Sequence, residues 1–281
     1  MNSEIRKYSH LINCKGKPYD LSTPKIMGII NCTPDSFYEK SRYSDLDTIE
    51  KTVGKMIEDG ADIIDIGGVS TRPGAQFPTI SEEKKRILPV IEFVQNKFPE
   101  ILISVDTMYG EVAQEAVDVG ICIVNDVSGG ELDESIMAVA GKNKVPYVLT
   151  HSPGFIKSII PFDSENYLVD VLSYLSKKIA LCKSYGIKDI IIDPGFGFSK
   201  SLEQNFELIK KFQLLHIFEC PILIGISRKS LIYKTLSISP EESLNGSTVL
   251  NTLLCSYGAQ IIRVHDVREM AQIRSIIALC S

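Results

Sequence analysis

The sequence has 281 residues with 30 Lys and Arg against 35 Asp and Glu, a formal net charge of −5. A chain of this length can bury enough surface to fold without disulfide or metal cross-links. No uncharged apolar run approaches the ~18 residues of a membrane span, and the polar start of the chain lacks the apolar core of a secretion signal. The acidic balance argues against a general nucleic-acid binder, because neutralising phosphates requires clustered Lys and Arg.

The seven cysteines are odd in number, widely spaced, and form no C-x-x-C pair. Most of them lie in apolar stretches, which is typical of buried, reduced thiols. This pattern predicts a protein of the cytoplasm rather than of an oxidising compartment.

Eight short apolar runs recur along the chain, and each is followed by a loop and a segment of helical periodicity. The runs begin near Ile26, Ile63, Ile101, Ile121, Val145, Ile190, Ile222 and Gln260. They are rich in Ile, Val and Leu and do not alternate with polar residues, which is typical of parallel strands buried on both faces. Helices are predicted at 45–59, 81–96, 111–119, 134–140, 164–185, 206–212, 241–257 and 267–279.

Eight strand–helix units predict an α/β fold, a (β/α)₈ TIM barrel. A doubly wound sheet is the alternative, because its local periodicity is the same. The number of units, and the lack of a G-x-G-x-x-G turn after the first strand, favour the barrel. Residues 1–24 are predicted to form a short N-terminal extension, a hairpin or arm, ahead of a single barrel domain at 25–281.

Nearly every apolar run ends in a polar side chain, and barrel enzymes carry their chemistry at the carboxyl ends of the strands. In chain order the runs end at Asn31, Asp65, Asp106, Asn125-Asp126, His151, Asp193, Ser227-Arg228-Lys229 and Arg263-Val264-His265-Asp266. A single Asp or Asn after a strand is usually a helix cap or a turn former. Eight strands that end this way predict a functional rim, in which Asp65 and Asp126 are expected to have structural roles.

Three residues of this rim suit a flat, nitrogen-rich heterocycle. Asp106 and Asp193 are acceptors, and Asn125 both donates and accepts. A carboxylate that faces an aminopyrimidinone edge can accept two parallel N–H bonds, which makes recognition specific. The rim is therefore predicted to bind such a ring.

Other residues of the rim suit an anion. Arg263 and His265 lie two residues apart, on the same side of one strand, and together fit a diphosphate. Lys229 supplies a further donor. The amide oxygen of Asn31 is a candidate ligand for Mg²⁺, which takes oxygen ligands and keeps several waters. The long loops at 33–43 and 67–78 are predicted to act as lids.

These segments, in this order, resemble the dihydropteroate synthase family of pterin-binding enzymes from Lys25 to Val267. The matching motifs are Met27–Phe37 (MGIINCTPDSF), Gly60–Gly68 (GADIIDIGG), Ser70–Ala75 (STRPGA), Ser104–Thr107 (SVDT), Asn125–Gly129 (NDVSG), Asp193–Phe198 (DPGFGF), Ser227–Lys229 (SRK) and Arg263–Val267 (RVHDV).

The resemblance implies a barrel enzyme of folate biosynthesis that is a target of sulfonamides. Such an enzyme joins p-aminobenzoate to 6-hydroxymethyl-7,8-dihydropterin diphosphate and releases diphosphate, with Mg²⁺ as cofactor. It implies a homodimer, whereas the acidic balance and the lack of a membrane-spanning apolar run are what predict no nucleic-acid or membrane partner. By matching position, the pterin would be held by Asp106, Asn125, Asp193 and Lys229, the diphosphate by Arg263 and His265 with Asn31 and Mg²⁺, and p-aminobenzoate by Thr71, Arg72, Phe198 and Ser227, with Asp35 and Phe37 on the first lid.

The expected chemistry needs charge stabilisation rather than a strong base. Cleavage of a C–O bond leaves a highly charged diphosphate, which Mg²⁺, Arg263 and His265 would stabilise. An arylamine is nucleophilic while neutral, so no nucleophile–base pair is required. Asp35, Asp106 and Lys229 complete the expected catalytic set. A helix that started at Arg228 would place the p-aminobenzoate carboxylate at a helix N-terminus.

The sequence departs from the family pattern in three places. The first lid reads Tyr38-Glu39-Lys40-Ser41 without the usual glycines, Val69 stands where Glu is common, and His151 is followed by Ser152-Pro153. The altered lid motivates one alternative, a paralogue that binds pterin without turnover. A second alternative is a methyltetrahydrofolate–corrinoid methyltransferase, which shares the pterin-binding barrel but needs no diphosphate site.

Overall fold

The computed structural model describes residues 11–32, 42–69, 77–154 and 167–280, without the side chains of 42–45. Eight of its strands lie in one parallel sheet. They are β3 (Lys25–Asn31), β4 (Ile63–Gly67), β5 (Leu102–Asp106), β6 (Ile123–Asp126), β7 (Tyr147–Thr150), β8 (Ile190–Asp193), β9 (Leu223–Ile224) and β10 (Ile261–Val264).

The sheet closes into a barrel. Its strand order is β8-β7-β6-β5-β4-β3-β10-β9. A parallel bridge between Ile192 and Ile222 joins the two ends, and the Ile192 N–H donates to the Pro221 carbonyl over 2.9 Å. The predicted barrel is therefore confirmed and the doubly wound alternative is wrong.

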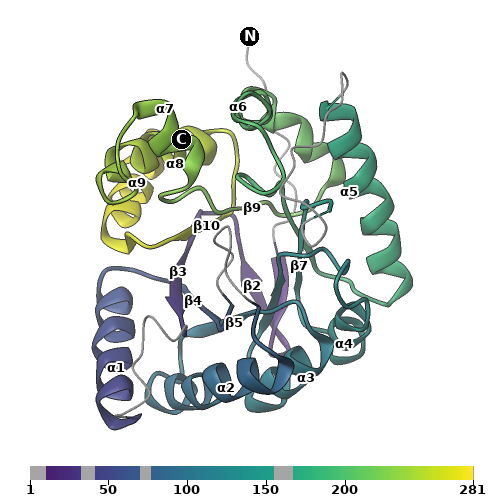
Figure 1. The fold of residues 1–281 in the computed structure, drawn as a ribbon, viewed down its shortest axis with the longest axis vertical. Helices are drawn as coiled ribbons and strands as arrows, with labels where there is room; N and C mark the ends of the chain where they lie inside the picture. The colour runs from purple at the N-terminus through teal and green to yellow at the C-terminus, as the bar shows by residue number, and fades with distance from the viewer. Residues whose placement is uncertain (1–10, 33–41, 70–76, 155–166, 281) are drawn as a thin grey trace.

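Helices form an outer ring around the strands, as Figure 1 shows. They are α1 (Arg42–Glu58), α2 (Ile80–Lys97), α3 (Gly110–Val119), α4 (Ser135–Asn143), α5 (Tyr167–Ser184), α6 (Leu202–Lys210), α7 (Ser230–Leu236), α8 (Leu244–Ser256) and α9 (Val267–Cys280), with 3₁₀ turns at Phe212–Phe218 and Glu241–Ser243. None of the helices in the described residues has the length and apolarity to cross a membrane.

Three helix predictions differ from the structure. Helix α6 begins at Leu202 rather than at residue 206, because Ser201 and Gln204 form a capping box there. The predicted helix 241–257 divides into a 3₁₀ turn and α8. The seven-residue α7 was not predicted, since it is too short to show helical periodicity.

A β-hairpin closes the amino end of the barrel. Strands β1 (Leu11–Cys14) and β2 (Lys17–Asp20) pair antiparallel around Lys15 and Gly16, which both have positive φ. Ile12, Cys14 and Leu21 pack onto a buried layer of strand side chains. That layer contains Met27, Ile63, Cys122, Ile123, Val148, Ile191, Leu223 and Ile261. The predicted division after residue 24 falls between this hairpin and β3.

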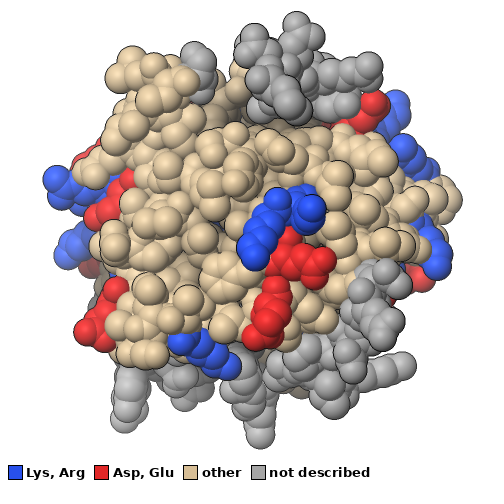
Figure 2. Space-filling view, turned by 90° about the horizontal axis from the view of Figure 1, so that it is seen from above, with Lys and Arg blue, Asp and Glu red and all other residues tan. Residues whose placement is uncertain are grey.

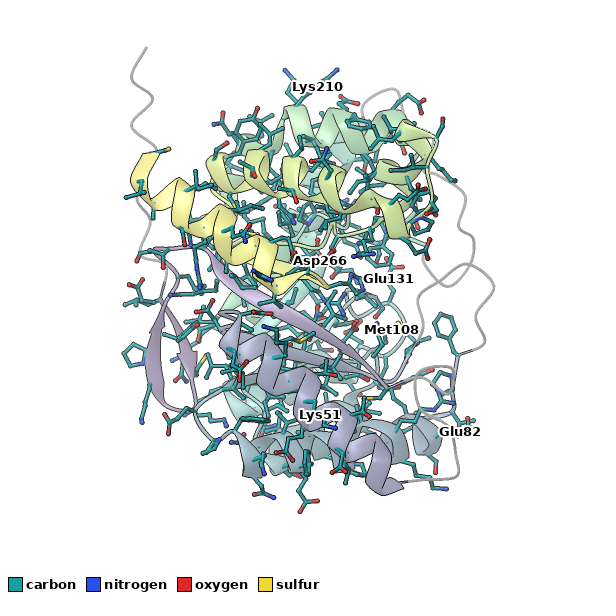
Figure 3. All side chains as sticks on the ribbon, turned by 90° about the vertical axis from the view of Figure 1, so that its left-hand side faces the viewer. Lys51, Glu82, Met108, Glu131, Lys210 and Asp266 are labelled. Carbon is teal, nitrogen blue, oxygen red and sulfur yellow. The ribbon has the colours of Figure 1, made fainter. Side chains whose placement is uncertain are left out.

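The carboxyl end of the barrel carries most of the residues that the sequence predicts to be functional. Figure 3 shows the hairpin at one end, and Met108 and Glu131, from the loops after β5 and β6, at the other. Side chains alternate along a strand, so the positions two and four residues beyond the apolar layer also face inward. Many of them are polar or glycine: Asn31, Asp65, Gly67, Ser104, Asp106, Asn125, Thr150, Asp193, Gly225, Ser227, Arg263 and His265. We call this end the barrel mouth.

Candidate active site

Arg263 joins two strands across the barrel mouth. Its Nε donates to Oδ2 of Asp65 and its Nη2 donates to Oδ2 of Asp106, each over 2.6 Å. Asp65 is completely buried, whereas the Asp106 side chain is 13% exposed. The guanidinium is therefore fixed between a carboxylate below the mouth and one that reaches solvent.

Asn125 belongs to the same network. Its Nδ2 donates to Oδ2 of Asp65 over 3.0 Å, deep in the barrel. Asn125 is paired in register with Asp106 on the neighbouring strand, so the two side chains lie next to each other at the mouth. The structure thus brings together three residues that the sequence predicted to line one site.

The pKa of Asp106 is raised to about 7. Burial is the main cause, because it disfavours the charged carboxylate. Arg263 opposes the shift, and the charge of Asp65 adds to it. A carboxylate that titrates near neutral pH within a cleft is typical of a functional site.

Asp193 and Lys229 form a second polar group of the mouth. Asp193 Oδ1 accepts the N–H of Gly195 over 2.7 Å, which orients the carboxylate. Burial raises the pKa of Asp193, and Lys229 opposes that shift. Burial likewise lowers the pKa of Lys229 to about 8, and Asp193 opposes this shift in turn. The two groups therefore act as mutual counter-charges.

The loop after β8 positions Lys229. Its Nζ donates to the Phe196 carbonyl over 2.6 Å and lies 4.2 Å from the centre of the Phe198 ring. Gly197 has a φ of +80°, and a Cβ there would lie 3.0 Å from Cδ of Lys229. The glycine therefore meets two demands, a left-handed backbone and close approach of the lysine.

Lys200, which the sequence did not single out, holds this loop to β7. Its Nζ donates to the carbonyls of His151, Gly195 and Phe198 over 3.0, 2.8 and 3.1 Å. Burial lowers the pKa of Lys200 to about 7. The sequence does not reveal this role, because any residue can supply a backbone carbonyl.

Replacing Lys200 by Met is expected to reduce stability by about 2 kcal/mol, because three partly buried carbonyls lose their hydrogen-bond donor. The same change should raise the KM for the pterin substrate, since Lys229 contacts this loop. Thermal unfolding and steady-state kinetics measure the two effects. Lys200→Arg should recover part of both losses, and an unaltered KM in Lys200→Met would contradict the positioning role.

Ser227 and His265 lie together on the neighbouring edge of the mouth. The Ser227 Oγ is 3.2 Å from Nδ1 of His265, whose side chain is exposed. Arg228 turns away, with Nε and Nη2 bound to the Asp266 carboxylate over 3.0 and 2.7 Å. The expected helix start at Arg228 is wrong, because α7 begins at Ser230.

Asn31 is the exposed last residue of β3, so its amide oxygen is accessible at the mouth. In the described part of the chain, no group of three His, Cys, Asp or Glu could hold a metal ion. An asparagine amide oxygen suits Mg²⁺, which takes oxygen ligands and usually keeps several waters.

Asp65 and Asp126, which the sequence predicts to be structural, differ in the groups that they bind. Asp126 is structural: its Oδ1 accepts from the N–H and hydroxyl of Ser128, and its Oδ2 from Gly130 N–H and the Tyr147 hydroxyl, over 2.6–2.8 Å. Asp65 instead faces the barrel interior and binds two of the predicted site residues. Position along the strand carries the signal, since Asp65 has the inward parity and Asp126 the outward one.

Four of the predicted site residues, Asp35, Phe37, Thr71 and Arg72, lie outside the described residues, as do most of the two predicted lids. Val69 is described, and it packs with Met108 and Val127 in a small apolar cluster. Phe198 packs against the same cluster. The unusual valine therefore forms part of an apolar wall beside the predicted p-aminobenzoate pocket.

The fold and the polar mouth define a barrel enzyme whose site lies at the carboxyl ends of the strands. Residues 27–265 match the family described as "Pterin binding enzyme". Dihydropteroate synthase of Escherichia coli K12 is 38% identical over 266 residues, which are 94% of each chain.

Solved structures agree with this match. Dihydropteroate synthase of Xanthomonas albilineans with 4-aminobenzoic acid is 33% identical, with a TM-score of 0.89 over 97% of this chain and 98% of that one. The Yersinia pestis enzyme in a sulfonamide complex is 35% identical, with a TM-score of 0.89 over 96% and 98%. The chain therefore belongs to the dihydropteroate synthase family, as the resemblance implied.

Proposed function

We propose that this protein condenses p-aminobenzoate with 6-hydroxymethyl-7,8-dihydropterin diphosphate, giving 7,8-dihydropteroate and diphosphate in folate biosynthesis. The observation that carries the proposal is the convergence of Asp106, Asn125, Asp193, Lys229 and Arg263 at one mouth. The family membership and the complex of the Xanthomonas relative with 4-aminobenzoic acid support it.

The pterin would lie against the buried polar wall of the mouth. Asp106 and Asp193 would accept ring N–H groups, and Asn125 would donate and accept. Lys229 would donate to a ring acceptor while it counters the charge of Asp193. Because Asn125 and Asp193 are buried, the edge of the ring that they hold would be shielded from water.

The diphosphate would lie at the exposed edge, beside His265, with Arg263 beneath it. Two of the five N–H groups of Arg263 are bound to carboxylates, so the anion assignment rests on its other N–H groups and on His265. Mg²⁺ bound through Asn31 would add positive charge where the leaving group gains negative charge.

The p-aminobenzoate would bind between Phe198 and Ser227. In the reaction the bond from the pterin methylene carbon to the diphosphate oxygen breaks, and a bond from that carbon to the arylamine nitrogen forms. The nitrogen then releases a proton to solvent. The neutral amine supplies the electron pair, so the protein needs to orient it rather than to deprotonate it.

The test is diphosphate release by the purified protein with Mg²⁺ and both substrates. Release that requires p-aminobenzoate supports the proposal. Pterin binding without turnover would contradict it and favour the paralogue, whereas methyl transfer from methyltetrahydrofolate would favour the methyltransferase.

Replacing Arg263 by Ala is expected to weaken binding of the pterin diphosphate by about tenfold or more. The variant loses a charged donor, and two carboxylates lose the cation that they bind. The KM of p-aminobenzoate should change far less. Steady-state kinetics with each substrate varied in turn measures both. An unaltered KM for the pterin diphosphate would contradict the role of Arg263.

We also infer a homodimer. Leu236 of α7, Val249 of α8 and Ile276 of α9 are 50%, 57% and 63% exposed. Figure 2 shows the face at the top of Figure 1, near α6–α8, where residues other than Lys, Arg, Asp and Glu predominate. Exposed apolar side chains on helices that pack against one another, α7 on α8 and α8 on α9, are typical of an interface. Sedimentation should give a dimer, and Val249→Glu should give a monomer; a monomeric wild type would contradict the inference.

A cytoplasmic location is also proposed. It rests on the free thiols, since all seven cysteines are unpaired and five of them are buried.

A further inference from the structure

Asp65 carries a buried charge to which the proposed reaction assigns no role. It lies in the middle of β4, is 0% exposed, and faces the barrel interior below the mouth. Both hydrogen bonds that it accepts come from predicted site residues, Asn125 and Arg263. Its other oxygen, Oδ1, is buried and has no hydrogen-bond partner among the described residues.

A purely structural aspartate in this protein looks different. Asp126 on β6 is equally buried, and both of its oxygens accept bonds from groups of its own loop and of β7. Among the described residues, Asp65 leaves one oxygen unbonded and uses the other for Asn125 and Arg263 alone. A buried carboxylate loses solvation, and so few hydrogen bonds compensate Asp65 poorly, which indicates a purpose other than stability.

We propose that Asp65 is a positioning residue, whose carboxylate fixes the Asn125 amide in the orientation that receives the pterin and holds the Arg263 guanidinium beneath the diphosphate, away from the pterin-binding groups of Asp106. This inference rests on the proposed function of the mouth. It adds a residue that touches no substrate and acts through two that do.

The effect on Asn125 follows from hydrogen-bond chemistry. An ionised carboxylate only accepts, so it can face only the NH₂ side of the amide. Asp65 therefore turns Oδ1 of Asn125 away from itself. Without that carboxylate, either end of the amide could face inward, and a ligand would meet a mixture of donor and acceptor.

The effect on Arg263 follows from its two ion pairs. Asp65 and Asp106 hold Nε and Nη2 from neighbouring strands, which fixes both the position and the plane of the guanidinium. Loss of the Asp65 charge would leave Asp106 as the sole carboxylate bonded to Arg263. The guanidinium could then turn toward Asp106 and compete with pterin N–H groups for it.

The experiment measures binding of 6-hydroxymethylpterin by titration calorimetry. Asp65→Asn is expected to weaken binding about tenfold, the scale of one misplaced buried polar contact. Asp126→Asn is the matched control, because it neutralises an equally buried aspartate outside the mouth. It should lower the melting temperature at least as much and leave pterin affinity within about twofold.

A double-mutant cycle separates positioning from general destabilisation. If Asp65 acts partly through Asn125, the factor lost on Asp65→Asn should be clearly smaller in an Asn125→Ala background, because coupled residues are not additive. Equal factors in both backgrounds would overturn the coupling to Asn125. If Asp65→Asn does not fold, Asp65→Ser, which leaves room for a water, carries the same expectations.

Two other outcomes are distinguishable. Wild-type affinity in Asp65→Asn, together with a large loss in Asn125→Ala, overturns the role of Asp65 and leaves the proposed site standing. Wild-type affinity in both variants overturns the pterin site itself.

Discussion

Replacing Lys229 by Met is expected to lower kcat/KM for the pterin diphosphate by about 100-fold or more, because the buried Asp193 carboxylate loses the positive charge of Lys229. The variant also loses the donor to the Phe196 carbonyl. The pKa of Asp193, which burial already raises, should rise further, which favours the protonated carboxyl group, in which one oxygen donates and only the other accepts a ring N–H.

Lys178→Met is the matched control for this loss. Its Nζ also donates to a backbone carbonyl, that of Gly129, over 2.8 Å. Lys178 belongs to α5 and not to the mouth, so its loss should affect stability more than kinetics. Equal falls in melting temperature and kcat/KM in the two variants would show that Lys229 acts through stability alone.

Replacing Asp106 by Asn is expected to produce the second large loss and to change the pH profile. The pKa of Asp106 is about 7, raised chiefly by burial, so the accepting carboxylate becomes populated as pH rises through 7. The pKa of Lys229 is about 8, lowered chiefly by burial, so its charge is lost as pH rises through 8. In the wild type, kcat/KM for the pterin diphosphate should therefore peak between these two values.

In Asp106→Asn the acid limb of that profile should disappear, and the maximum should fall by about 100-fold. The alkaline limb should remain, because Lys229 is intact. A profile of unchanged shape in Asp106→Asn would mean that another group sets the acid limb. The measurement is kcat/KM for the pterin diphosphate at saturating p-aminobenzoate between pH 5 and 10.

The barrel was predictable because its evidence is periodic. Buried parallel strands are continuous apolar runs, and here nearly every run ends in a polar residue of recognisable chemistry. The same regularity let the sequence place Asp106, Asn125, Asp193 and Arg263 at one end of the molecule.

The partners of these residues were not predictable, because they depend on the direction of side chains across strands. Asp65 resembled a turn-forming aspartate until the register showed it opposite Ser104, facing inward. Arg228 and Lys229 are adjacent in sequence, yet one binds Asp266 outside the mouth and the other reaches Phe196. Lys200 donates to backbone carbonyls, which any residue supplies, so the sequence does not reveal these contacts.

The most direct test is a crystal structure of the protein with 6-hydroxymethylpterin. The ring is predicted to lie inside the barrel mouth, with N–H groups on Asp106 and Asp193, the Asn125 amide beside them, and Lys229 at a ring acceptor. A ring bound elsewhere on the protein, or in the mouth without contact to these residues, would contradict the proposed site.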